Sequence, residues 1–369
     1  MDKIRASVDG ICAWSKFLLV VDLQLTVLND QKVLFKFREG SMEQYLQTPR
    51  MISQILDLDA SLPPDFFSTA EFSDLLVWLW TAKDKDGALW SIKKSSEILS
   101  QGCPIIDLML TTVEGKDGKE GLLLHLASRP RRYIDAVVES IVERAKLVQD
   151  NADSQHPEQV MMFLLGLFEI ALALRTNTWV QHGLSASHYL ARFSSALEEV
   201  TRSLFKIQSK LPTKLLIHKG IFTLAVLANH DHRRSLLDWR DLLAGKLLLT
   251  LGRVLVVPVS EPNDDRMPFT RQGAHEASDD LLQTIAARIA FPSVLSRLAL
   301  GLPNNELASI PINKDTENLW KVINAAKENL RIYRFLKETN TSYLCDYPKV
   351  RPLLFFFHIY QYGSDLERP

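Results

Sequence analysis

Glycine is scarce in this chain, with 15 glycines among 369 residues. Parallel α/β enzymes with glycine-rich phosphate loops usually contain more, since average proteins hold roughly 7% glycine. The sequence also contains no GxxxxGK[ST], GxGxxG, GxSxG or HExxH motif. We therefore expect no nucleotide-binding α/β fold, no serine or zinc hydrolase of these classes, and no bound cofactor. No residue is assigned a catalytic, cofactor-binding or metal-binding role.

Cysteine is rare and dispersed. Cys12, Cys103 and Cys345 lie far apart, and no CxxC or Cys/His cluster occurs. This pattern argues against a disulfide framework and against a structural zinc site, and it is typical of a reducing compartment. The apolar stretch Phe17–Val21 is too short for a secretory signal. We expect an intracellular protein, cytoplasmic or nuclear.

Neither sign of charge predominates. The chain has 43 basic and 44 acidic residues, so its formal net charge is −1. Such a balance provides no long-range field that would attract nucleic acid or anionic lipid. The basic clusters Arg129–Arg132 and His232–Arg234 are short and separate, so we interpret them as solvated helix ends. No nucleic-acid partner is expected.

Long uninterrupted apolar runs are missing as well. Val160–Leu174 is interrupted by Glu169, and Leu242–Val259 contains Lys246 and Arg253. Both fall short of the ~20 apolar residues that cross a bilayer. The first is expected to be a buried central helix, with Glu169 at its rim or paired with an arginine of a neighbouring helix. We expect no membrane insertion.

Helical periodicity is what the sequence has in abundance. In one stretch, apolar residues recur along a single helical face: Ile134, Val137, Val138, Ile141, Val142 and Ala145. Glu139, Glu143, Arg144 and Lys146 are predicted on the opposite, solvated face. Residues 189–207 and 319–333 repeat this pattern. Only Lys32–Phe37 alternates loosely, and we favour helix over strand even there. The fold class predicted is all-α.

One helix has a recognisable start. The run from Ser68 to Glu71 matches a capping box, which makes Ser68 the expected N-cap. On the helix that follows, Trp78 shares the apolar stripe and is predicted in the core. Trp80 points elsewhere, so it is either an exposed anchor for a partner or a second packing contact.

The expected helices fall into pairs of roughly 40 to 60 residues, the size of HEAT or armadillo units. An irregular α-solenoid of such pairs is the architecture we predict, and a two-lobed globular helical bundle is the alternative. The polar segment Gln149–His156 predicts a boundary between an N-terminal lobe, residues 1–150, and a C-terminal lobe, residues 156–369. Pro258–Asp280 lacks periodicity and is predicted to be a mobile loop.

The sequence offers few candidates for metal chemistry. His230 and Asp231 form the HD dipeptide of metal-dependent phosphohydrolases, and upstream His188 or His218 and downstream Asp279 are the residues available to complete a metal shell. A dipeptide of this kind also arises by chance, and the basic residues that follow it would repel a metal. We interpret it as a polar turn between helices. Asp264-Asp265 lacks the third acid of a terpene-synthase motif.

Several segments resemble a known group of proteins in their general sequence pattern. The run Asp74–Trp80, the segment Trp14–Val21, and Tyr133-Ile134 after Arg129-Pro130 resemble armadillo-like helical regions of fungal proteins. Those proteins often end in a MYND-type zinc finger. This sequence has no such finger, so the resemblance implies a helical scaffold without zinc.

Taken together, these features predict an intracellular helical-repeat scaffold for protein–protein interaction, whose partner is another protein. Stacked helix pairs provide extended binding surfaces without a catalytic constellation. Two alternatives stay open. One is an all-α phosphohydrolase of the HD type that uses His230 and Asp231, and the other is a protein that binds a hydrophobic small molecule between its helices.

Overall fold

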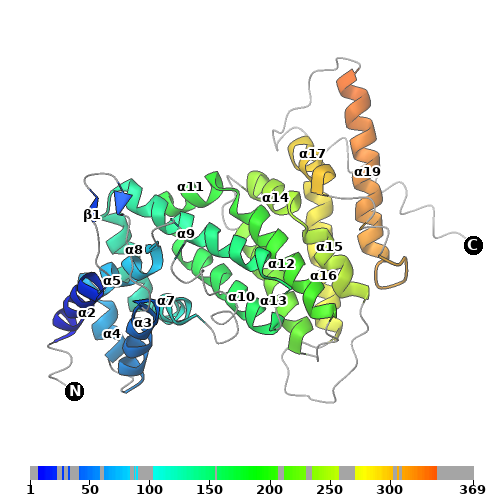
Figure 1. The fold of residues 1–369 in the computed structure, drawn as a ribbon. Helices are drawn as coiled ribbons and strands as arrows, with labels where there is room; N and C mark the ends of the chain where they lie inside the picture. The colour runs from blue at the N-terminus through cyan, green and yellow to red at the C-terminus, as the bar shows by residue number, and fades with distance from the viewer. Residues whose placement is uncertain are drawn as a thin grey trace, which may run out of the picture. The chain divides into compact units, whose positions relative to one another are not determined.

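The computed structural model describes residues 7–22, 27–28, 32–33, 41–58, 62–83, 87, 89, 103–153, 156–206, 212–229, 235–256, 271–301, 306 and 310–338. Helices dominate these residues, and the predicted all-α class is confirmed (Figure 1). The strands β1 (Val27–Leu28) and β2 (Lys32–Val33) pair antiparallel, with Val27 opposite Val33. Helix was favoured at Lys32–Val33, so that expectation is wrong there. Residues 34–37 lie outside the described part of the chain.

The chain forms two compact units, Met1–Leu224 and Ala225–Pro369, with the division inside helix α13 (Pro212–Asn229). The predicted boundary at Gln149–His156 differs from this division, because it falls inside the first unit. There it separates two helices that pack against each other, α9 (Arg131–Asp150) and α10 (Pro157–Leu174). A polar connection between helices of one core has the same composition as a linker between domains, which explains the difference.

The first unit is built from helices that share one core. Besides α9 and α10 these are α2 (Val8–Asp22), α3 (Ser41–Asp57), α4 (Leu62–Phe67), α5 (Ala70–Thr81), α7 (Pro104–Glu114), α8 (Lys116–Ala127), α11 (Thr178–Ala186) and α12 (Tyr189–Lys206). Helix α9 packs against α5, α10, α11 and α12, and α7 packs against α3, α8 and α10. The apolar stripe predicted on α9 is buried at Ile134, Val137, Val138 and Ile141.

Helix α10 is long and apolar enough to cross a membrane by length and composition. In the structure, however, 67% of its 18-residue window is buried inside the protein. It packs against α7, α9 and α12, as expected of a central helix. Glu169 is half-buried and lies 3.4 Å from Lys219 Nζ, so its partner is a lysine where an arginine was expected.

Two glycines of α8 allow α4, α7 and α8 to approach closely. A Cβ atom on Gly118 would collide with the carbonyl oxygen of Thr112, and one on Gly121 would collide with that of Phe67. The two glycines are three residues apart and therefore lie on one face of the helix. Their role is packing, and only Gly115 stands at the junction between α7 and α8.

The second unit contains the end of α13 with α14 (Ser235–Ala244), α15 (Leu247–Val256), α16 (Arg271–Arg288), α17 (Pro292–Gly301) and α19 (Glu317–Glu338). Helix α14 packs on α17, and α16 and α17 both pack on α19. The buried Trp239 donates from Nε1 to Asn229 Oδ1 at 2.8 Å, which ties α14 to the end of α13.

The mobile loop predicted at Pro258–Asp280 is wrong over its last ten residues. Arg271–Asp280 belongs to helix α16, and residues 258–270 lie outside the described part of the chain. The start of α16 is polar and includes Gly273, so it carries no apolar stripe that would reveal a helix. The apolar residues Leu281, Leu282 and Ile285 appear only in its later turns.

Candidate functional site

Helix α2 presents apolar side chains to the solvent. One side of the helix is buried at Val8, Cys12 and Leu19, which recur at helical spacing and face the protein. On another side Trp14 is 59% exposed, Phe17 is 52% exposed, and Leu18 is exposed as well. We call Trp14, Phe17 and Leu18 the α2 face. An amphipathic surface helix normally carries polar residues there.

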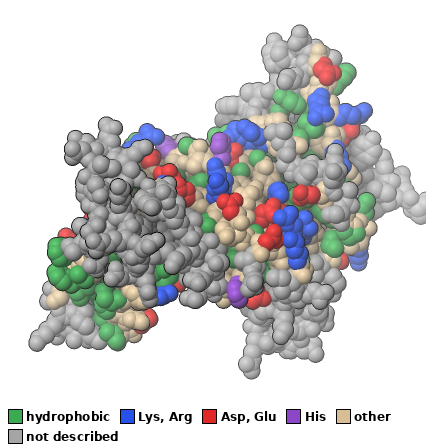
Figure 2. All heavy atoms as spheres, in the orientation of Figure 1, with side chains coloured by type: hydrophobic (Ala, Val, Ile, Leu, Met, Phe, Trp, Pro, Cys, Tyr) green, Lys and Arg blue, Asp and Glu red, His purple; other side chains and the backbone are tan. Residues whose placement is uncertain are grey.

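The two aromatic rings of the α2 face lie together. The rings of Trp14 and Phe17 stack with centroids 5.3 Å apart and an interplanar angle of 24°. Hydrophobic side chains gather at the same edge of the molecule, over α2 and α3 (Figure 2). Met51 and Leu58, on and just after α3, are among the exposed apolar residues. Contiguous exposed apolar surface of this kind marks binding sites more often than isolated apolar residues do.

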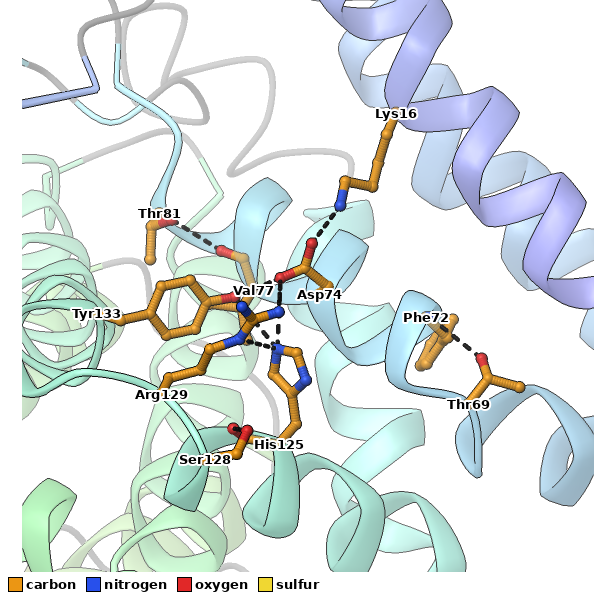
Figure 3. Close-up of polar contacts among 10 residues, drawn as sticks. All are labelled: Lys16, Thr69, Phe72, Asp74, Val77, Thr81, His125, Ser128, Arg129 and Tyr133. Carbon is orange, nitrogen blue, oxygen red and sulfur yellow. Dashed lines mark hydrogen bonds and ion pairs between the residues drawn. The ribbon is translucent and has the colours of Figure 1, made fainter. Parts of the chain in front are cut away.

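A cluster of polar residues holds α2 to the body of the first unit. Asp74 on α5 accepts a hydrogen bond from Lys16 Nζ of α2, and its other oxygen accepts from Arg129 Nη2 at 2.7 Å and from Tyr133 Oη at 3.2 Å. We call Lys16, Asp74, His125, Arg129 and Tyr133 the Asp74 cluster. Figure 3 shows the side chains of Lys16, His125, Arg129 and Tyr133 converging on the Asp74 carboxylate.

His125 fills the buried side of the cluster. Its Nε2 lies 3.5 Å from Asp74 Oδ1, 3.4 Å from Tyr133 Oη and 3.3 Å from Arg129 Nε. With the ring proton on Nδ1, Nε2 accepts from the Arg129 guanidinium, whereas a proton on Nε2 allows this nitrogen to donate to the Asp74 carboxylate. In both forms the ring fills the space between α8 and the start of α9.

The sequence of α5 explains why Asp74 faces this cluster. Thr69 caps the helix by accepting from Phe72 N at 3.2 Å, and the apolar residues that follow are buried. Asp74 and Trp78, four residues apart, occupy the strip that is only partly buried. The predicted cap at Ser68 is therefore wrong by one residue, because the helix begins at Ala70.

The electrostatics of the cluster decide what it can do. The hydrogen bond with His125, together with Lys16 and the charge of Arg129, holds the pKa of Asp74 well below its usual range despite partial burial. Burial, and next the charge of Asp74, raise the pKa of Tyr133. A general base or acid works best with a pKa near the working pH. At neutral pH this aspartate stays ionised and this tyrosine stays protonated, so these two groups connect α5 to α2 and α9 through charged and polar contacts.

Of the two tryptophans of α5, Trp80 takes one of the two roles predicted for it, a packing contact, and Trp78 is less buried than predicted. Trp80 is fully buried, and its Nε1 donates to Val137 O at 3.4 Å, whereas Trp78 is only partly buried. Arg144, predicted on the solvated face of α9, is also buried and lies over the Trp80 ring. Trp80 is thus a packing contact, whereas Trp14 on α2 is exposed.

The residues considered for metal chemistry do not form a site within the described ranges. His230, Asp231, Asp264 and Asp265 lie outside these ranges. His218 stacks on Phe222, His188 adopts a left-handed φ of 53°, and Asp279 accepts from Asn318 Nδ2 at 2.9 Å. No group of three or more His, Cys, Asp or Glu residues suited to a metal occurs among the described residues.

Sequence reasoning missed most of the Asp74 cluster. Lys16 and Asp74 are 58 positions apart, and Arg129 is 55 positions from Asp74, so no local spacing connects them. The available signal was a charged residue within the apolar stretch of each of two helices, Lys16 in α2 and Asp74 in α5, which indicates a partner on a neighbouring helix. No protein family, curated protein or solved structure matches the chain.

Proposed function

We propose that this protein is a helical scaffold for protein–protein interaction and that the α2 face is one of its contact surfaces. The observation that carries the proposal is the exposure of Trp14 and Phe17, at 59% and 52%, on a helix whose opposite side is buried. Tryptophan and other large aromatic residues are enriched at binding surfaces, where their burial contributes much of the affinity.

The attachment of α2 supports this role. Lys16 lies two residues from Trp14 and one from Phe17, and it is bound to Asp74 on α5. The ion pair limits the motion of α2 relative to α5, so the aromatic side chains are held in place before a partner arrives. A surface that is already ordered loses less conformational entropy on binding.

The wider architecture we propose is an irregular, armadillo-like α-solenoid of helix pairs inside the cell. Successive helices of the first unit pack on near neighbours in the chain, as α7 does on α8 and α9 does on α10. This is the contact pattern of stacked helical units. The described cysteines, Cys12 and Cys103, are buried free thiols, which agrees with a reducing compartment.

Site-specific photo-crosslinking tests the proposal. Benzoylphenylalanine replaces Phe17 in one preparation and Leu124 in a control. Leu124 is 72% exposed on α8 of the same unit and lies outside the α2 face. Each preparation is mixed with native extract and irradiated, and the protein cross-linked at position 17 is identified. This partner is then purified, and its affinity is measured for the native protein and for two alanine variants.

The comparison uses Trp14→Ala/Phe17→Ala and the control Leu124→Ala. Because all three side chains are exposed, each variant should keep the circular-dichroism spectrum of the native protein. We expect the double variant to raise the Kd for the partner by about tenfold or more and the control to leave it unchanged. The proposal would be refuted if the partner bound the double variant and the Leu124→Ala control with equal affinity. It would also be refuted if no cross-link were specific to position 17.

A further inference from the structure

Helices α9 and α11 begin next to each other. The guanidinium carbon of Arg131 lies 5.7 Å from the centroid of the Trp179 ring. Further along, a Cβ atom on Gly183 would lie 3.0 Å from Cγ2 of Val138. The earlier residue of α9 contacts the earlier residue of α11, and the later contacts the later, so the two helices run in the same direction. Their N-terminal ends therefore lie at the same end of the helix pair. Each N-terminus carries the positive end of a helix dipole.

Basic residues occupy the start of α9. Acidic residues normally occupy the first turn, where they offset the dipole. The first turn of α9 contains none, its N-cap is Pro130 without a side-chain hydrogen bond, and it starts with Arg131 and Arg132. Of the described carboxylates, Asp135 lies 4.0 Å from Arg131 Nε, and none forms an ion pair with Arg132. Among the described residues, the positive charge of Arg131 is offset by Asp135, whereas that of Arg132 has no carboxylate partner.

An exposed aromatic ring lies in the same place. Trp179 is 52% exposed, with the Arg131 guanidinium over its ring and the His182 ring edge-on at 6.2 Å. Asn177 caps α11 by accepting from Trp179 N at 3.0 Å, which fixes the position of the tryptophan. Basic and histidine side chains lie together on the surface around α11 (Figure 2). We call Arg131, Arg132, Trp179 and His182 the α9–α11 end.

We propose that the α9–α11 end binds an acidic segment of a partner protein, with carboxylates at Arg131 and Arg132 and an apolar side chain against Trp179. This surface is separate from the α2 face and goes beyond the function proposed for it. Charge complementarity specifies the partner, because Asp and Glu side chains pair with guanidinium groups and favour helix N-termini. Tracking of nucleic acid needs a longer basic stripe than two adjacent arginines.

The test uses a fluorescein-labelled peptide of six glutamates around one phenylalanine, titrated with the full chain and followed by fluorescence anisotropy. We expect Arg132→Glu and Trp179→Ala each to weaken binding by about tenfold, and binding to weaken as salt is raised. Lys146→Glu makes the same change of charge on an exposed position of the same helix, 14 residues away, and should change the Kd by less than about twofold. Trp179→Phe keeps an aromatic ring and should retain most of the affinity.

Three results would overturn the proposal. The first is no binding of the peptide by the native protein, and the second is an equal loss in Lys146→Glu and Arg132→Glu. The third is tighter binding of a single-stranded oligonucleotide of equal charge through the same residues, which would assign the surface to nucleic acid. The variant Trp14→Ala/Phe17→Ala should bind the acidic peptide normally, so failure of either surface can be recognised independently of the other.

Discussion

The guanidinium of Arg144 lies 4.0 Å from the centroid of the Trp80 ring in the interior of the first unit. Both side chains are buried, and Arg144 Nη1 donates to Ser140 O at 3.2 Å. Within the described part of the chain no carboxylate forms an ion pair with Arg144, and burial lowers its pKa. The aromatic face of Trp80 and the Ser140 carbonyl therefore both offset the burial of this positive charge.

This arrangement predicts that replacing Arg144 and replacing Trp80 change the free energy of unfolding by different amounts. Arg144→Met removes a charge whose burial is costly and retains much of the side-chain volume, so it should change the free energy of unfolding by no more than about 1 kcal/mol. Trp80→Ala leaves a large cavity and should cost about 3–5 kcal/mol. Urea denaturation of the two variants measures both quantities. A loss of stability in Arg144→Met as large as that in Trp80→Ala would mean that the guanidinium has an anionic partner.

Asp74→Asn should destabilise the first unit at pH 7 by about 2 kcal/mol, because the charged hydrogen bonds with Lys16 and Arg129 are lost. The pKa of Asp74 in the folded protein lies well below its usual range. A depressed folded pKa contributes stability that is fully present above the unfolded pKa of about 4 and is lost as pH falls below it.

The difference in stability between native protein and Asp74→Asn should therefore not change through titration of Asp74 itself from pH 5 to pH 7. It should shrink as the pH is lowered from about 4 toward the folded pKa of the aspartate. Thermal unfolding of both proteins across this range tests the sign. A difference that grows as the pH falls below about 4 would contradict the assignment of Asp74 as an ionised tether.

Alanine at Gly118 or at Gly121 should destabilise the protein by about 1–3 kcal/mol, although alanine favours helices more than glycine does. At both positions the added Cβ meets a backbone carbonyl oxygen that cannot move freely. Gly10 on α2 is the matched control, because nothing lies within 4 Å of its Cβ position. Gly10→Ala should stabilise by up to about 1 kcal/mol. Equal effects at the three positions would contradict the close packing of α8.

Cys12 and Cys103 should resist alkylation in the folded protein. Both are buried, and burial raises the pKa of Cys12 to about 12 and also raises that of Cys103. The reactive thiolate is therefore rare at pH 8. Iodoacetamide labelling with and without urea, followed by peptide mapping, measures the protection. Labelling of Cys12 at the rate of the unfolded chain would show that α2 is not packed against α5.

Periodicity in the sequence predicted the positions of the helices well, but it predicted less well which face of each helix is buried. The stripe Ile134–Ala145 of α9 is apolar on one side only, so its buried face followed from spacing alone. Helix α5 is apolar nearly all round and is packed by α2, α7, α8 and α9. For such a helix spacing does not tell which of Trp78 and Trp80 is buried. Arg144 was misassigned because a charged residue is normally exposed, and its aromatic partner is 64 positions away.

The candidate surfaces were harder to predict than the helices. The Asp74 cluster joins residues more than 50 positions apart, and the α9–α11 end joins Arg131 to Trp179, 48 positions away. Spacing patterns within a short stretch of sequence do not predict contacts between residues so far apart. The sequence also does not tell which arginines of Arg129–Arg132 are paired. In the structure Arg129 forms an ion pair with Asp74, and Arg132 forms none with a described carboxylate.

Hydrogen–deuterium exchange of the complex with the protein cross-linked at position 17 tests the central claim most directly. The exchange of peptides from α2 is compared between the free scaffold and the complex, with the α8 peptide around Leu124 as the internal reference. The α2 face predicts slower exchange in residues 8–22 on binding and no change around Leu124. Unchanged exchange across α2 in a saturated complex would contradict the role of this helix as a contact surface.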